Sequence, residues 1–219
     1  MCRSYENYVA RLIAKGYKVA ICEQMEDPAL AKGLVKRDII RVVTPGTVIE
    51  SSMLQDDKNN YIASIYITEK KAGVCFADVS TGTAHATVLT DEKLGPEIIS
   101  ELCRYSPSEV LFNAAILDYK EVTAYIKQQL ACSVELLDEA AFAPDACMEE
   151  MRAQFGDAPE KTAGLAPESP AFTALAVLLG YLKETQKKGV ERLKTVHNYA
   201  EAQYMQLSPV TRANLELTE

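Results

Sequence analysis

Long apolar runs are missing from this sequence, which excludes a membrane-spanning helix. The longest uninterrupted apolar runs, such as residues 174–179, reach about a third of the ~20 residues that cross a bilayer. Residues 1–15 are polar and follow a helical period, so they lack the apolar stretch of a secretory signal. We therefore expect no contact with a membrane and a cytoplasmic location.

Histidine is scarce and cysteine is scattered, so nothing in the sequence indicates a metal site. The only histidines are His85 and His197, and the six cysteines form no C-x-x-C pair. A zinc site would need ligands from distant parts of the chain. We expect the cysteines to be reduced thiols that serve as small apolar residues.

The usual signatures of catalysis are absent as well. The sequence contains no G-x-x-x-x-G-K-[ST] phosphate loop, no G-x-G-x-x-G fingerprint and no G-x-S-x-G elbow. Neither histidine has a sequence context that is typical of a catalytic triad. We therefore expect a chain that is not an enzyme and has no cofactor or metal of its own.

Charge is distributed unevenly along a chain whose formal net charge is −8. Residues 1–48 hold eight Lys and Arg against five Asp and Glu, a net charge of +3, whereas residues 49–167 hold nine against twenty. Because the DNA backbone is densely negative, only the first segment is electrostatically suited to it. The acidic middle segment should be repelled by DNA.

Hydrophobic periodicity divides the chain into three pieces, and a hydrophobic content of 48% is enough to bury a core. The first piece, residues 1–48, has the pattern of a helix over residues 4–15 and of strands at residues 19–22 and 35–43. It therefore resembles the remnant of an α+β domain.

Four cations lie in or near the second of these strands. The period of two places Arg37 and Arg41 on one face of the strand and Lys36 on the other, while Lys32 falls in the preceding loop. One interpretation is a phosphate-binding surface. The alternative is a solvated strand edge, which charged side chains often protect from aggregation.

The second piece, residues 49–157, changes its period partway. Three strand-like segments at residues 61–68, 74–79 and 83–89 are joined by short turns that contain Gly, which predicts an antiparallel meander. Helical and strand patterns then alternate over residues 94–102, 110–112, 119–126, 134–137 and 142–151. The order βββαβαβα indicates the α/β class with parallel later strands, and it is similar to the ribonuclease H fold.

A ribonuclease H-like sheet raises the hypothesis of a metal-dependent nuclease. Such a site needs clustered carboxylates around Mg²⁺. The first strand, residues 61–67, has no acidic residue, and Asp78 is placed to bind the backbone of its own turn. The nuclease therefore stays an alternative rather than the prediction.

The third piece follows a Pro- and Gly-spaced segment, residues 158–170, which predicts a linker. Residues 172–186 have the pattern of a long helix, and residues 204–207 that of a short strand. Ser208-Pro209 is a typical start of a further helix. Because this helix has begun where the sequence ends, we expect the chain to be part of a longer protein.

Several stretches of sequence closely resemble the MutS family of DNA mismatch-repair proteins. They are VAICEQMEDP at residues 19–28, AKGLVKR at 31–37, RVVTPGT at 41–47, NYIA at 60–63, DVSTG at 78–82, YLKETQ at 181–186 and TRANLEL at 211–217. Residues 91–170 match mainly by the order of their elements. The resemblance thus extends over the whole chain.

The resemblance implies a domain division. Residues 1–48 would be the end of the mismatch-binding domain, residues 49–157 the ribonuclease H-like connector, residues 158–170 a linker, and residues 171–219 the start of the helical core or lever domain. The family's Phe-x-Glu mismatch-reading motif and its ATPase domain have no counterpart in this sequence. The chain would therefore be a non-catalytic portion of a protein that, when intact, uses ATP and magnesium.

The resemblance also implies partners. Arg37, Lys36, Lys32 and Arg41 would contact the DNA backbone, which positions a protein without reading sequence. Duplex DNA would bind weakly through residues 1–48, MutL would bind the connector, and the intact protein would be a homodimer. The alternatives to a MutS fragment are the nuclease and a stand-alone protein-interaction module at residues 49–167.

Overall fold

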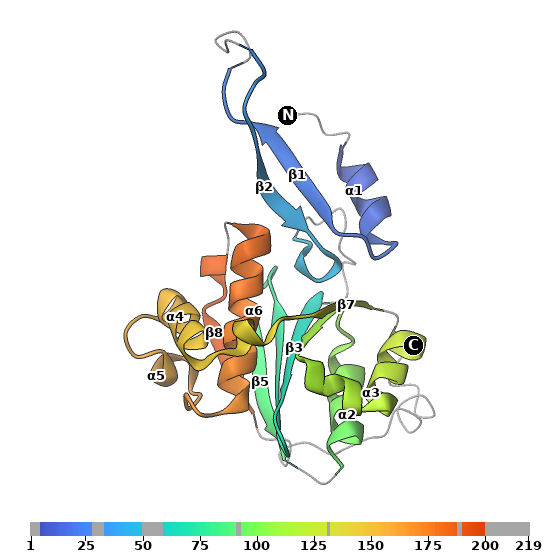
Figure 1. Ribbon diagram of the computed structural model, residues 1–219, viewed down its shortest axis with the longest axis vertical. Helices are drawn as coiled ribbons and strands as arrows, with labels where there is room; N and C mark the ends of the chain where they lie inside the picture. Colours follow the sequence, from blue (N-terminus) through green and yellow to red (C-terminus); the bar gives the residue numbers. More distant parts are fainter. Residues whose placement is uncertain are drawn as a thin grey trace.

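The computed structural model describes residues 5–27, 33–49, 59–90, 93–130, 132–187 and 190–199. These residues form a small unit at the amino-terminal end and a larger layered unit after it (Figure 1). Strands and helices both contribute, so the expected mixed α/β class is confirmed. None of the described helices is long and apolar enough to cross a membrane.

The small unit consists of helix α1 (Tyr5–Ile13) and the antiparallel strands β1 (Val19–Gln24) and β2 (Arg37–Val43). The turn η1 (Pro45–Thr47) follows β2. The amphipathic helix and strands predicted from the sequence are thus confirmed. Only Val9, Val43 and Val48 are fully buried in the described core of this unit. The small unit, as we call it below, therefore has little hydrophobic stabilisation of its own.

The larger unit is built on one six-stranded sheet with the order β7-β6-β3-β4-β5-β8. Its strands are β3 (Tyr61–Ile67), β4 (Ala72–Asp78), β5 (Thr83–Leu89), β6 (Glu109–Phe112), β7 (Ser133–Leu136) and β8 (Thr195–Asn198). β3, β4 and β5 form the predicted antiparallel meander. β6 and β7 extend the sheet in parallel, as their helical connections predicted. β8, which pairs in parallel with β5, was not predicted.

Helices cover both faces of the sheet (Figure 1). One face packs against α2 (Leu94–Tyr105) and α3 (Lys120–Tyr125), with the turns η2 (Ala114–Asp118) and η3 (Ile126–Leu130) beside them. The other packs against α4 (Pro144–Phe155), α5 (Pro159–Ala163) and α6 (Pro170–Gln186), with the turns η4 (Glu139–Phe142) and η5 (Val190–Arg192). β4 is buried along its whole length because both faces are covered.

The segment at residues 158–170, expected to be a linker, holds α5 and the start of α6. Pro159 and Pro170 occupy the first helical positions, and Gly164 adopts the left-handed conformation at the end of α5 with φ 65°. Leu165 is buried in the core that α6 shares with the sheet. The Pro and Gly spacing therefore begins and ends helices, and α6 packs on β3, β4 and β5.

Five of the six cysteines lie among the described residues, and two of them, Cys75 and Cys147, are buried as small apolar residues would be. Cys22, Cys75, Cys103, Cys132 and Cys147 are all free thiols. Burial raises the pKa of the Cys147 thiol to about 11, with Glu150 adding to the effect, so the thiol stays protonated. The strand expected at residues 204–207 and the helix expected after it lie outside the described residues.

Candidate nucleic-acid interface and its junction

The candidate DNA-contacting residues gather on strand β2 and just before it. Arg37 is the first residue of the strand and is exposed, and Lys36 precedes it. The Lys36 backbone N–H donates to Glu26 Oε1 at 2.6 Å, which fixes the chain as it enters β2. Lys32 lies outside the described residues. Lys36 and Arg37 therefore present two cations at one end of the small unit.

Arg41 lies at the opposite end of β2 and is half-buried. Its Nε donates to Gln186 Oε1 at 2.7 Å, and its Nη2 donates to the Thr47 carbonyl oxygen at 3.0 Å. The guanidinium thus links β2 to the end of α6 and to the turn that follows β2. This geometry makes Arg41 part of the junction between the two units.

The expectation that Arg37 and Arg41 share a face of β2 is wrong. Arg37 pairs with Gln24, whereas Arg41 pairs with Ile21, an odd number of residues away on β1. Paired side chains lie on the same face and successive ones alternate, so the two arginines point to opposite faces. The cause is a bulge that skips Ile40 in the register, and an extra residue of this kind has no sequence signature here.

Strand alternation separates charge on the small unit. Glu23 pairs with Asp38, so these two carboxylates lie on one face of the ladder. Arg37 lies on the other face, beside Gln24 and near Ile39. An arginine away from the carboxylates of its own ladder is better placed to attract an anion than one directly opposite an acid.

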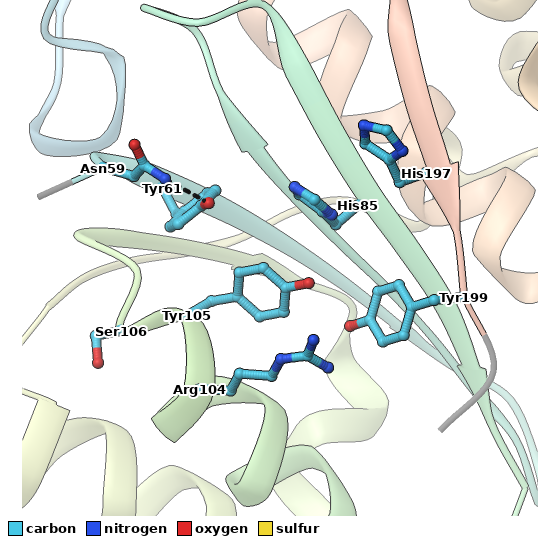
Figure 2. Close-up of a pocket in the computed structure, with 8 residues that line it drawn as sticks. All are labelled: Asn59, Tyr61, His85, Arg104, Tyr105, Ser106, His197 and Tyr199. Carbon is cyan, nitrogen blue, oxygen red and sulfur yellow. Dashed lines mark hydrogen bonds between the residues drawn. The ribbon is translucent and has the colours of Figure 1, made fainter. Parts of the chain in front are cut away.

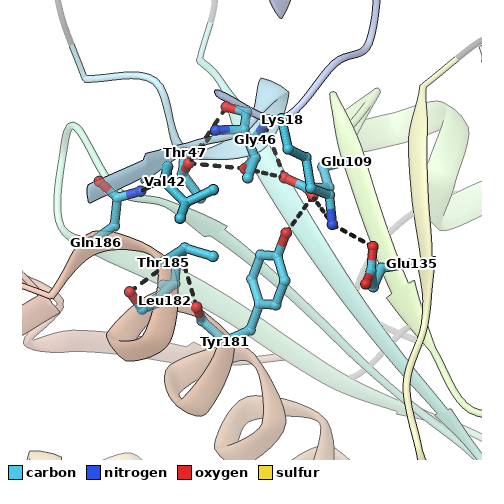
Figure 3. Close-up of polar contacts among 11 residues, drawn as sticks. Lys18, Val42, Gly46, Thr47, Glu109, Glu135, Tyr181, Leu182, Thr185 and Gln186 are labelled. Atoms are coloured by element: carbon cyan, nitrogen blue, oxygen red, sulfur yellow. Dashed lines mark hydrogen bonds and ion pairs between the residues drawn. The ribbon is translucent and has the colours of Figure 1, made fainter. Parts of the chain in front are cut away.

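Helix α6 holds β2 through the backbone as well as through Arg41. Gln186 Nε2 donates to the Val42 carbonyl oxygen at 3.2 Å, and Lys187 Nζ donates to that of Ile39 at 2.5 Å. Figure 3 shows Gln186 turned toward Val42 from the end of α6. The cation-bearing strand is therefore attached to the helix that covers the larger sheet.

A pocket of about 640 Å³ lies between the end of α2 and strands β5 and β8, and it extends to Tyr61 at the start of β3 (Figure 2). Its lining is rich in tyrosine and holds both histidines, which stack with ring centroids 5.1 Å apart. Burial, then His197 and Arg104, lowers the pKa of His85, which therefore favours the neutral form. His85 lies on β5, which the sequence predicted as a strand, and His197 lies on β8, which it did not.

The carboxylate of Glu101, beside this pocket, is bonded to other side chains of the protein. Glu101 is buried and accepts a hydrogen bond from the Tyr199 hydroxyl at 2.5 Å. Arg104 lies 3.9 Å from the same carboxylate and over the rings of Tyr105 and Tyr199. These contacts make the pocket wall a packed polar and aromatic cluster.

Asp78 has the role expected from the sequence. Its Oδ1 accepts from the backbone N–H of Ser80 at 2.8 Å and from the Ser80 hydroxyl at 2.6 Å. The N–H of Thr81 also points to it at 3.3 Å. Among the residues that the structure describes, no three His, Cys, Asp or Glu side chains cluster in a way that could hold a metal ion.

Glu109, like Glu101, is a buried acidic residue that was not identified from the sequence. Glu109, at the start of β6, has no exposed surface and lies between the small unit, α6 and β7 (Figure 3). The signal was present, because Glu109 opens a strand whose other residues, Val110, Leu111 and Phe112, are all apolar. An acid at the edge of a buried strand needs partners, but the sequence does not say which.

Two family models match the chain. The model described as MutS domain II matches residues 60–196, which include β3 to β7, the start of β8 and the helices on both faces of the sheet. The model described as MutS domain I matches residues 2–52, which include the small unit. The boundary between the matches falls between the two units.

Curated relatives agree with these models. The DNA mismatch repair protein MutS of Ruminiclostridium cellulolyticum is 41% identical over 214 residues, which are 98% of this chain and 24% of the relative. That of Acetivibrio thermocellus is 40% identical over 220 residues, 99% of this chain and 24% of the relative. The chain thus spans about a quarter of the length of the curated relatives it matches. On these matches, the chain belongs to the MutS family.

Proposed function

We propose that this chain is the part of a mismatch-repair protein that joins a DNA-contacting strand unit to a non-catalytic connector. The observation that carries the proposal is the attachment of β2: a strand with exposed cations at one end is bonded to α6 at the other. Such an arrangement places a phosphate-binding surface at a fixed position relative to the sheet. The repair activity of the intact protein depends on parts beyond this quarter of its length.

The proposed DNA contacts are Arg37, Lys36 and Lys32, with Arg41 in a supporting role. Arg37 is exposed, and its ladder partner is the neutral Gln24. Arg41 already bonds Gln186, so we assign it mainly to holding the strand. Contacts of this kind are made to phosphates, which makes the binding weak, salt-dependent and independent of sequence.

The larger unit fits the role of a ribonuclease H-like connector. An antiparallel meander is continued on its β3 side by two parallel strands, and β3 itself carries no acidic residue. We propose that it is non-catalytic, receives MutL on its acidic surface, and acts in the cytoplasm within an ATP- and magnesium-dependent homodimer. The acidic middle segment of the sequence favours a protein partner there over DNA.

Fluorescence anisotropy with matched and G·T duplexes at low salt tests the DNA contact. We expect weak binding without preference for the mismatch, and Arg37→Glu should weaken it and lower the salt slope by about one. Lys161→Glu on α5, an exposed residue, makes the same charge change away from β2 and serves as the control. An equal loss in both variants would contradict the assignment of Arg37.

Three further outcomes bear on the proposal. A roughly tenfold preference for the G·T duplex, or about 1.4 kcal/mol, would show that the chain reads mismatches. Strand cleavage after addition of Mg²⁺ or Mn²⁺ would replace the connector role with that of a nuclease. Specific binding of a protein partner without any affinity for DNA would favour a stand-alone interaction module.

A further inference from the structure

Glu109 is a fully buried carboxylate at the point where the small unit meets the sheet. Its Oε2 accepts from the Thr44 hydroxyl and from the Gly46 backbone N–H, the latter at 3.2 Å. Its Oε1 accepts from the Tyr181 hydroxyl of α6 at 2.6 Å. One side chain of β6 therefore binds the end of the small unit and α6 at the same time (Figure 3).

The charge of this carboxylate is compensated from the small unit. Lys18, just before β1, places Nζ 3.8 Å from Glu109 Oε1 and also bonds Glu135 of β7. The same ammonium lies 5.2 Å from the centre of the Tyr181 ring. A buried charge is tolerated when it is paired and hydrogen-bonded in this way. Both ends of the small unit, before β1 and after β2, are thus fixed to Glu109.

Tyr181 acts as a donor to this carboxylate. Burial, followed by the charge of Glu109, raises the pKa of the Tyr181 hydroxyl well above its usual value. The hydroxyl therefore stays protonated and donates a hydrogen bond to Glu109 Oε1. Hydrogen bonds to a charged acceptor are stronger than those between neutral groups, so the contact orients α6 as well as Glu109.

The backbone approaches Glu109 too closely for any side chain to intervene. A Cβ added to Gly46 would lie 2.8 Å from Glu109 Cβ and 2.9 Å from Ile62 Cβ. Both of these atoms are attached directly to strands of the sheet, so neither can move without the backbone. The turn η1 therefore sits against β3 and β6 without a gap.

Two distant sequence segments meet here. Residues 41–47 supply Thr44, Gly46 and Arg41, and residues 181–186 supply Tyr181 and Gln186 to the same junction. Their contribution to a DNA interface is indirect, because the side chains that carry the contacts point inward. The polar contacts of these two segments hold the small unit on the larger one.

We infer that Glu109 is a positioning residue, whose carboxylate fixes β2, and with it Arg37, on the sheet and on α6. The evidence is the convergence of donors from η1 and α6 on this one buried group. The part that concerns DNA rests on the proposed function. The part that concerns the attachment of the small unit does not.

Amide hydrogen exchange on the full chain tests the attachment. Glu109→Gln removes an acceptor oxygen and the charge while keeping the shape, so exchange of peptides at residues 37–49 should rise by about tenfold or more. Peptides of β4 should keep their protection. The control is Glu101→Gln, which changes another buried carboxylate that accepts a hydrogen bond from a tyrosine hydroxyl, that of Tyr199 in the larger unit rather than a group of the small unit or α6.

The inference fails if Glu109→Gln leaves residues 37–49 unchanged, if it accelerates β4 equally, or if Glu101→Gln has the same effect on residues 37–49. Should Glu109→Gln not fold, Tyr181→Phe and Thr44→Val each remove a single donor and should accelerate the same peptides to a smaller extent. The inference also fails if exchange at residues 37–49 is unchanged in both of these variants.

DNA affinity separates this inference from the proposed function. If the small unit is held in place in a smaller fraction of molecules, the affinity for DNA falls by the same factor. The Glu109→Gln variant should therefore bind DNA less tightly than the Glu101→Gln variant. If exchange rises while Arg37→Glu leaves DNA affinity unchanged, the proposed DNA contact fails and the positioning role stands. If Arg37→Glu weakens binding while Glu109→Gln changes neither exchange nor affinity, only the positioning role fails.

Discussion

At Gly46 the backbone of the junction lies close against the sheet. A methyl group at this position would lie within 2.9 Å of two Cβ atoms, those of Glu109 and Ile62. We expect Gly46→Ala to lower the free energy of unfolding by about 1–3 kcal/mol, because overpacking must be relieved by moving backbone. Urea denaturation followed by circular dichroism measures the change.

The sign of this effect distinguishes it from a general effect of replacing glycine. At Gly180, within α6, an added Cβ would lie 3.6 Å from Glu150 Cγ, which is an ordinary contact. Gly180→Ala should therefore raise the free energy of unfolding by up to about 1 kcal/mol through helix propensity. A neutral Gly46→Ala would show that η1 can move away from the sheet.

At the scale of single residues, the sequence predicted a residue's role better when its partners lie nearby in the sequence. The turn-forming role of Asp78 follows from its position next to Ser80 and Thr81, and the structure confirms it. The junction roles of Glu109 and Arg41 depend on partners more than sixty residues away in the sequence. No local pattern specifies such partners, so these roles appear only once the chain is folded.

At the scale of elements, the start of α6 packs closely against β4 at Gly73. A Cβ at Gly73 of β4 would lie 1.9 Å from the Pro170 carbonyl oxygen and 2.4 Å from the Ala171 nitrogen. Both are backbone atoms, so relief requires the start of α6 to move off the sheet. Gly73→Ala should therefore cost at least about 3 kcal/mol of unfolding free energy, measured in urea.

The result for Gly73→Ala tests whether α6 is firmly seated. If Gly73→Ala lowered the free energy of unfolding by less than about 1 kcal/mol, the helix would shift easily, as a helix on a linker would. A large loss would agree with the shared core, in which Leu175 and Leu178 of α6 are fully buried. The same seating is needed if α6 is to hold β2.

The elements that the sequence predicted are those with a clear period. The meander, α2, α4 and the helix at residues 170–186 show regular apolar spacing, and each is present. β8 has four residues, with one half-buried valine between exposed positions, too short for a period to be recognised. The bulge in β2 was also missed, because a single extra residue changes no composition or spacing that could be read.

At the scale of the whole molecule, the response to mild acid depends on very few groups. The chain has two histidines, and histidine is the side chain whose ordinary pKa lies near neutrality. Burial, His197 of β8 and Arg104 of α2 lower the pKa of His85 below 6.5. The rings of Tyr61 and Tyr105 also lie beside the His85 ring.

The sign of the pH effect follows from proton uptake. As pH falls through 6.5, the unfolded chain protonates this histidine before the folded chain does, so unfolding becomes easier. The stabilisation from neutral His85 is present above this pH and is lost as pH falls through the lowered pKa of the folded state. We expect the free energy of unfolding to decline as pH falls below about 7, and His85→Gln should flatten that decline. His197→Gln, which removes only one of the causes, should flatten it in part. An unchanged pH profile in His85→Gln, measured by urea denaturation across this range, would show that His85 does not couple protonation to folding.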